Sequence, residues 1–349
     1  MTQRTIAALL AVPMVIALLV AAWTRPLPYV TYEPGLTVDV LGQDNGREII
    51  QVQGHRTYRD DGELRMTTVY VSRPRADIRL YELMTDWLSR KDAVYPYDAV
   101  YQQNETDEDS KTEGAVDMVS SQDAAVAVAL HELGFQAKPA IEVLYVDPGS
   151  PADGRLRVRD IFLRVNGQKI TDADQLKQAI SGTEPGEAVH FTVLRDGRHV
   201  EVSVVPEEDE GEPRVGIQLG GGFIFPFEVE VNINPDIGGP SAGLMFSLGI
   251  YDTLTPGSLT GGQTVAGTGT IDASGKVGPI GGIQQKIAGA SGDGAELFLV
   301  PPDNCKDAIG AQNGDMRLVK APTMHSAVES IQAWVEDPKA DLPSCKDAS

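Results

Sequence analysis

A lysine lies on the apolar stripe of a short helix that the sequence predicts after a glycine-rich run. Ile283, Lys286, Ile287 and Ala290 follow the i, i+3, i+4, i+7 spacing of a buried helix face. A charged amine without a partner is costly in such a place, and burial lowers its pKa instead. The lysine is then a candidate general base. The spacing alone leaves a second interpretation open, in which Lys286 reaches solvent from the edge of the stripe.

A serine flanked by small residues precedes this lysine. Ser241 lies in the segment Gly-Gly-Pro-Ser-Ala-Gly at 238–243, and apolar residues follow it at helical spacing: Leu244, Leu248 and Tyr251. The serine is therefore predicted at a helix N-terminus, where free backbone N–H groups and the helix dipole stabilise an oxyanion. Ser241 and Lys286 together suggest a nucleophile and its base, with an amine in place of the imidazole of a catalytic triad.

Residues 236–304 resemble the proteolytic domain of the Lon family of Ser–Lys proteases. Four blocks match in order: Gly-Pro-Ser-Ala-Gly at 239–243, Ala-Gly-Thr-Gly at 266–269, Gly-Lys-Val-Gly-Pro-Ile-Gly-Gly at 275–282, and Lys286. Val-Pro-Pro-Asp-Asn at 300–304 closes the match. The resemblance implies that Ser241 is the nucleophile, that Lys286 is its base and that Thr268 orients the amine. The family usually has an acidic residue where this chain has Gly238.

Two other functions remain open for this segment. Gly239, Ser241 and Gly243 also match the nucleophile elbow of α/β-hydrolases, which needs a downstream acid and a histidine. His325 is the histidine that follows Ser241. Alternatively, the domain is a catalytically silent scaffold, an interpretation that the missing acid at 238 favours.

Residues 121–206 resemble a bacterial PDZ domain, which is rich in strands and has two helices. Gly-Ser-Pro-Ala at 149–152 and Asp-Ile-Phe-Leu-Arg-Val-Asn-Gly at 160–167 carry the resemblance. Leu133, Gly134 and Phe135 match the family's carboxylate-binding loop, which implies that they hold a peptide C-terminus. Arg159 departs from the family, which usually has glycine there. The domain could also order the protease and bind nothing.

The N-terminus suggests attachment to a membrane. Residues 6–23 form an uncharged, apolar run of about 27 Å as a helix, long enough to span a bilayer core. An uncleaved, single-pass signal anchor is favoured over a signal peptide cleaved near 20–22. Cys305 and Cys345 are the two cysteines of the chain and are predicted to form a disulfide, although two free thiols remain an alternative. The body of the protein is therefore expected on the extracytoplasmic side of the cell membrane.

The whole sequence predicts an α+β multidomain protein. Its expected parts are a transmembrane helix at 6–23, a small α+β connector at 29–120, the PDZ domain at 121–206, a Lon-type α/β proteolytic domain at 207–337 and a tail at 338–349. Lon-type domains tend to form rings, so the resemblance implies a homo-oligomer.

Composition limits the partners and cofactors. The chain has 50 acidic and 29 basic residues, a net charge of −21, and no basic stripe, so nucleic acid is not expected as a partner. The two cysteines lack the spacing that metal ligands usually have. Gly275 and Lys276 approach a phosphate-binding loop, but Thr270 and Val277 break its pattern. The expectation is an endopeptidase without cofactor or ATP that cleaves unfolded or exported polypeptides selected by the PDZ domain.

Overall fold

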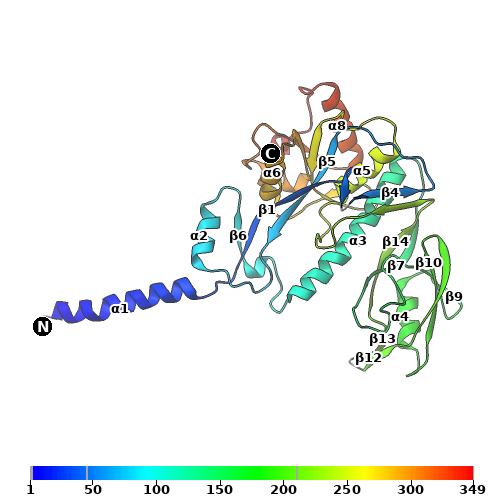
Figure 1. The fold of residues 1–349 in the computed structure, drawn as a ribbon, viewed down its shortest axis with the longest axis horizontal. Coiled ribbons are helices and arrows are strands. Elements are labelled where there is room, and N and C mark those ends of the chain that lie inside the picture. The colour runs from blue at the N-terminus through cyan, green and yellow to red at the C-terminus, as the bar shows by residue number, and fades with distance from the viewer. Residues whose placement is uncertain (1–2, 45, 210, 349) are drawn as a thin grey trace.

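The computed structural model describes residues 3–44, 46–209 and 211–348, apart from the side chains at 3–8, 19, 21, 22, 347 and 348 (Figure 1). Helix α1 (Gln3–Thr24) projects away from the rest of the chain. Within the described residues, no helix combines the length and the apolar content that crossing a bilayer requires. The prediction of a transmembrane helix at 6–23 is therefore not supported.

A mixed sheet forms the centre of the larger domain. Its strand order is β20-β19-β16-β5-β1-β6, in which β16 pairs in parallel with both β5 and β19, and β1 pairs antiparallel with β5 and β6. The strands are β1 (Tyr29–Asp39), β5 (Glu63–Val71), β6 (Ala93–Pro96), β16 (Thr264–Gly267), β19 (Leu297–Val300) and β20 (Arg317–Lys320). Strands from the two ends of the sequence therefore share one sheet.

The predicted connector at 29–120 is consequently not a separate module. Leu64 and Met66 of β5 are fully buried and belong to the same core as Leu244 and Leu297 of the later segment. The interpretation as a connector failed because strand pairing joins segments that lie about two hundred residues apart, as in the pair Glu63 and Thr264. Local sequence carries no signal for such a partner.

Helices cover both faces of this sheet. On one face pack α3 (Asp107–Glu132), α5 (Gly243–Leu254) and α8 (Met324–Glu336); on the other packs α6 (Ile283–Gly292), with α7 (Cys305–Ala308) beside it. Strand β19 contributes to both faces. Leu297 and Leu299 belong to the hydrophobic core under α3, α5 and α8, whereas Phe298 and Val300 belong to the core under α6 and α7. A strand buried on both faces is apolar throughout.

A second sheet forms the smaller domain, with strand order β11-β10-β8-β7-β14. Its elements are β7 (Lys138–Val146), β8 (Ile161–Val165), α4 (Ala173–Ser181), β10 (Val189–Arg195), β11 (Arg198–Val204) and β14 (Ile217–Ile224). Asp172 caps α4 by accepting a hydrogen bond from the Gln175 amide. Strand β14 joins this sheet from beyond residue 206, and α3 begins before residue 121.

Helix α3 runs between the two domains (Figure 1). Along its length it packs against α5 of the larger domain and against β7 and β14 of the smaller one. Just past the middle of α3, the Arg159 guanidinium donates to the Gln122 side chain and lies 3.7 Å from the Asp123 carboxylate. The helix therefore belongs to both domains at once.

The C-terminal tail is packed rather than irregular. A disulfide joins Cys305 to Cys345. Leu342 is buried in the main core, and the amide of Lys320 in β20 donates to the Pro343 carbonyl. The tail therefore covers the β20 edge of the sheet.

The remaining elements are short or peripheral. They are β2 (Gln43–Asp44), β3 (Arg47–Glu48), β4 (Ile50–Gln53), α2 (Leu80–Leu88), β9 (Gln168–Lys169), β12 (Glu207–Asp209), β13 (Glu212–Arg214), β15 (Glu228–Val231), β17 (Thr270–Ile271), β18 (Val277–Gly278), and the 3-10 turns η1 (Tyr97–Ala99), η2 (Pro302–Asn304) and η3 (Cys345–Ala348).

The shared sheet makes a testable prediction about Leu64→Ala. Removal of this buried side chain from β5 should lower the free energy of unfolding of the whole larger domain by about 2–5 kcal/mol. Denaturant unfolding would be followed by the fluorescence of Trp334, which is buried in the same core, in a chain carrying Trp23→Phe and Trp87→Phe. Leu36→Ala, at a side chain that is 61% exposed, is the control and should change stability by about 0.5 kcal/mol or less. An unchanged Trp334 transition in Leu64→Ala would show that β5 folds apart from that core.

Candidate active site

The candidate site is built around the side chain of Lys286 on α6. This side chain is 2% exposed, so it lies inside the domain and does not reach solvent from the edge of the helix. Gly282 precedes α6 in the left-handed conformation, with φ of 68°. A Cβ at this glycine would lie 2.8 Å from Val69 Cγ1. The chain can approach β5 this closely only because residue 282 is a glycine. This approach places α6, and with it Lys286, against the sheet.

Three oxygen atoms surround the Lys286 amine. Nζ lies 2.7 Å from Ser241 Oγ, 3.1 Å from Thr268 Oγ1 and 3.0 Å from the Thr67 carbonyl. The Thr268 hydroxyl donates to the Ser241 carbonyl at 3.0 Å, so its oxygen is free to accept from Nζ. A neutral amine has two N–H donors and one lone pair. Thr67 and Thr268 can take the two donors, which turns the lone pair toward the hydroxyl of Ser241.

Burial sets the protonation of this amine. Desolvation lowers the pKa of Lys286 from its usual 10.5 to about 7. A large fraction of the amine is therefore neutral near neutral pH, which is the form that can accept a proton.

The loop before Ser241 is held by α3. The Gly239 amide donates to the Gly114 carbonyl at 2.8 Å, and the Ser121 hydroxyl donates to the Pro240 carbonyl at 2.9 Å. A Cβ on Gly238 would lie 3.2 Å from the backbone of Gly114. Close packing against α3 thus explains why this position holds a glycine. Asp236, the nearby acid, is exposed.

The N-terminus of α5 provides backbone donors beside Ser241. In the part of the chain that the structure describes, hydrogen bonds occupy the amides of Gly239, Gly243 and Leu244, but not those of Ser241 and Ala242. These two amides can therefore donate to an oxyanion that forms at the serine.

Three contributors to the site have no signal in the sequence. They are the carbonyls of Thr67 and Gly114 and the hydroxyl of Ser121, all within the region first interpreted as a connector or as the start of the PDZ domain. Every residue has a backbone carbonyl, so only the tertiary structure shows which carbonyl faces the amine.

His325 lies on α8 and pairs with acidic side chains. Its Nδ1 is 2.6 Å from Glu132 and its Nε2 is 3.4 Å from Glu329, with the histidine side chain 63% exposed. The hydrogen bond to Glu132 raises the pKa of His325. An α/β-hydrolase would need this ring at Ser241, where the structure places Lys286 instead. That alternative is therefore not supported.

Leu133, Gly134 and Phe135 follow the C-terminal end of α3. Leu133 and Phe135 pack against the core of the larger domain, and the Phe135 ring contacts His55 and Phe227. A groove of about 820 Å³ instead lies between α4 and β14 and is lined by residues that include Lys177, Ile180, Gly216, Ile217 and Leu219. Strand β14 is the edge strand of its sheet. A second apolar–Gly–apolar triplet, at 215–217, lies in this groove, and the assignment of the peptide loop to Leu133, Gly134 and Phe135 stays a prediction.

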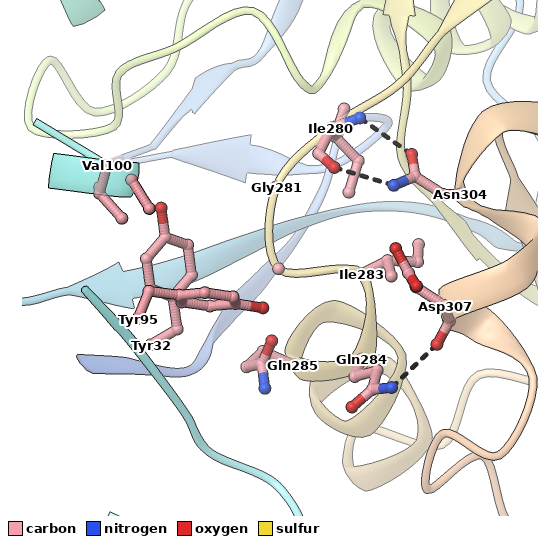
Figure 2. A pocket seen from close by; sticks show the side chains of 12 residues that line it. Tyr32, Tyr95, Val100, Ile280, Gly281, Ile283, Gln284, Gln285, Asn304 and Asp307 are labelled. Atoms are coloured by element: carbon pink, nitrogen blue, oxygen red, sulfur yellow. Dashed lines mark hydrogen bonds between the residues drawn. The ribbon is translucent and has the colours of Figure 1, made fainter. Parts of the chain in front are cut away.

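A separate cavity of about 430 Å³ opens beside the start of α6 (Figure 2). The rings of Tyr32 and Tyr95 pack edge to face at 5.1 Å on one side of it. On the other side, the Asn304 side chain donates to and accepts from the backbone of Ile280, both at 2.9 Å. Among the described residues, no cluster of three or more histidine, cysteine, aspartate or glutamate side chains is arranged to hold a metal ion.

The buried amine makes stability depend on pH in a defined direction. Between pH 7 and 10.5 the unfolded chain binds a proton at Lys286 that the folded chain lacks, so stability rises with pH by about 1.4 kcal/mol per unit. In Lys286→Met this contribution to the slope should disappear. Urea unfolding from pH 6 to 9.5 checks it, with Lys276→Met, at an exposed lysine, as the control. Equal slopes in the wild type and Lys286→Met would contradict the lowered pKa.

Comparisons with known proteins agree with this architecture. Residues 116–205 match the family model of the PDZ domain, and residues 234–326 match that of the Lon protease (S16) C-terminal proteolytic domain. The chain is 32% identical over 110 residues to Lon protease 2 of Bacillus subtilis, which covers 30% of this chain and 19% of that protein. It is 32% identical over 78 residues to the serine endoprotease DegS of Haemophilus influenzae, covering 22% of this chain and 23% of that protein.

A solved structure of the PDZ domain of the SdrC-like protein from Listeria innocua is 24% identical, with a TM-score of 0.22, and covers 23% of this chain and 92% of that one. The chain spans only about a fifth of the length of the curated relatives named above. The first model covers strands β7 to β11 of the smaller sheet, and the second covers β16, β19 and β20 of the larger sheet together with the segment that bears Ser241 and Lys286. The chain therefore joins a PDZ domain to a proteolytic domain of the Lon type.

Proposed function

We propose that this protein is a serine-type endopeptidase in which Ser241 and Lys286 form the catalytic dyad. One observation carries the proposal: the buried Lys286 Nζ lies 2.7 Å from Ser241 Oγ, with oxygen acceptors for its two other hydrogens. A lysine with a purely structural role would not require the Ser241 hydroxyl within hydrogen-bond distance of its amine.

The geometry supports an acyl-transfer mechanism. Lys286 Nζ takes the proton of the Ser241 hydroxyl while Oγ attacks the scissile carbonyl. The amides of Ser241 and Ala242 stabilise the oxyanion. The resulting ammonium gives its proton to the leaving amine, which departs and leaves an ester on Ser241. Water then attacks the ester, with Lys286 again as base, and the carboxylic acid product is released.

The proposed reaction needs no ATP. The sequence carries no Walker A loop, since Thr270 and Val277 replace the glycine and the Ser/Thr of that pattern. Peptide hydrolysis by a serine and its base uses no nucleotide. The proposed substrates are therefore polypeptides that are already unfolded, such as exported chains before they fold.

A peptidase assay tests the dyad. Hydrolysis of a fluorescently labelled unfolded protein without ATP should be lost in Ser241→Ala and Lys286→Met and kept in His325→Ala. The rate should rise with pH through an apparent pKa near 7, because only the neutral amine accepts the serine proton. Activity that survives Lys286→Met would rule out the dyad. A wild type without activity would favour a silent scaffold.

We further propose that the groove between α4 and β14 selects substrates. The free edge of β14 can pair with an extended peptide, and amides at 215–217 can hold its terminal carboxylate. Gly216 has φ of 74°, which turns the chain between β13 and β14. Ile180, Ile217 and Leu219 give the groove an apolar lining for the side chains of the peptide.

Fluorescence polarisation tests this second proposal. A labelled decapeptide with apolar C-terminal residues should bind about tenfold or more tightly with a free carboxylate than with an amide, because hydrogen bonds to a charged group contribute about 1.5–3 kcal/mol. Leu219→Asp should abolish binding, and Val205→Asp, at an exposed position outside the groove, should not. Equal affinity for both peptides would leave the PDZ domain an ordering role only.

Location and assembly are also proposals. The described apolar side chains of α1 are exposed on every side of the helix, which favours lipid as their surroundings and supports attachment to a membrane. The disulfide between Cys305 and Cys345 supports an oxidising, extracytoplasmic location for the body of the chain. A ring-shaped homo-oligomer is proposed from the resemblance to Lon-type domains.

A further inference from the structure

Helix α2 presents an apolar face to solvent. Met84, Trp87 and Leu88 follow the i, i+3, i+4 spacing and are 51%, 76% and 71% exposed, whereas Leu83, one turn before Trp87, is buried. Contiguous apolar surface of this kind marks an interaction site in a soluble domain. None of these three side chains lines the dyad, the groove or the cavity of Figure 2.

This face continues onto α1. Helix α1 leaves the body beside α2 (Figure 1), and the ring of Trp23 near its end stacks on Tyr81 of α2 at 5.8 Å. The exposed apolar side chains of α1 lie on all sides of the helix: Leu9, Leu10, Val12, Met14, Val15, Ile16, Leu18 and Val20. A lipid surface can contact the exposed apolar side chains of both helices at once.

The charge around α2 differs from that of the chain. The chain carries −21 overall, yet residues 73–91 hold five basic and three acidic residues. Arg75, Arg79, Arg90 and Lys91 are exposed there, as is Arg25 at the end of α1. Anionic lipid headgroups attract such a cluster, whereas they repel the rest of this acidic protein.

We propose that α2 is an interfacial helix that lies in the headgroup region of an anionic bilayer, with Trp87 and Leu88 inserted and the neighbouring cations on the lipid phosphates. An aromatic residue and a leucine on one face, with cations at both ends, are the pattern of a helix that lies in the membrane interface. The inference depends on the attachment through α1 and is independent of the peptidase chemistry.

The position of α2 orients the catalytic domain. The chain after α2 passes Lys91, whose carbonyl accepts a hydrogen bond of 3.1 Å from the Gln285 side chain next to Lys286, and then forms β6 with Tyr95 at the cavity. A membrane that contacts α2 would therefore lie close to the segment that borders this cavity. Polypeptides close to the lipid surface would reach the cavity first.

Tryptophan fluorescence of the full chain tests the proposal. In a chain that carries both Trp23→Phe and Trp334→Phe, Trp87 is the single remaining tryptophan and reports on its surroundings. With vesicles of phosphatidylcholine and phosphatidylglycerol, we expect a blue shift of its emission, loss of quenching by iodide, and quenching by lipids brominated near the headgroup. Pure phosphatidylcholine should give weaker effects. The chain with only Trp334, which is 3% exposed, is the matched control and should not respond to brominated lipid.

Three results would overturn the inference. Trp87 could stay accessible to iodide while a chain with only Trp23 is quenched by brominated lipid, which would mean that α1 binds lipid without α2. Iodide quenching of Trp87 could vanish without vesicles as the protein concentration rises, which would identify a second copy as the occupant. Leu88→Asp could leave the lipid response of Trp87 unchanged, while the same substitution in the chain with only Trp334 shows that the variant is folded.

Discussion

The burial of one amine is the constraint around which the larger domain is arranged. Lys286 Nζ sits under α6 and over β5, and the oxygens of Thr67, Thr268 and Ser241 are its partners. Desolvation makes the ammonium unfavourable, so the same packing that costs stability at low pH produces a base near neutral pH. The site therefore requires a finished core, including the strands that come from the N-terminal third of the chain.

Helix α3 connects this site to the PDZ domain. Gly114 and Ser121 hold the backbone of the loop before Ser241. The next two residues of the helix, Gln122 and Asp123, meet Arg159, which has φ of 71°. The unusual Arg159 thus has a structural role at the junction between the domains.

A buried carboxyl completes this junction. Burial, together with the neighbouring Asp123, raises the pKa of Glu142 on β7 to about 10, so Glu142 is neutral at pH 7. Strand β7 pairs with β14, whose other edge borders the groove. Strand β14, which borders the peptide groove, and helix α3, which holds the loop of Ser241, therefore link the groove to the nucleophile.

Local patterns predicted the parts of the chain whose structure depends on near neighbours. The stripe through Lys286 became α6, and the apolar residues after Ser241 became α5. The two family segments were also confirmed, because their glycine, serine and proline patterns reflect local turns. The interpretation of 29–120 as a separate connector was wrong, since it depended on which distant strand pairs with which.

The sequence by itself determined which helix faces are apolar, where turns need glycine, and that a serine and a lysine of one domain could meet. Only the tertiary structure decided that the Thr67 carbonyl faces the amine, that Gly114 takes the space of an acid at 238, and that the triplet at 215–217 borders the groove. The physical reason is that backbone groups are the same in every residue. Their roles follow from long-range packing, which no short stretch of sequence encodes.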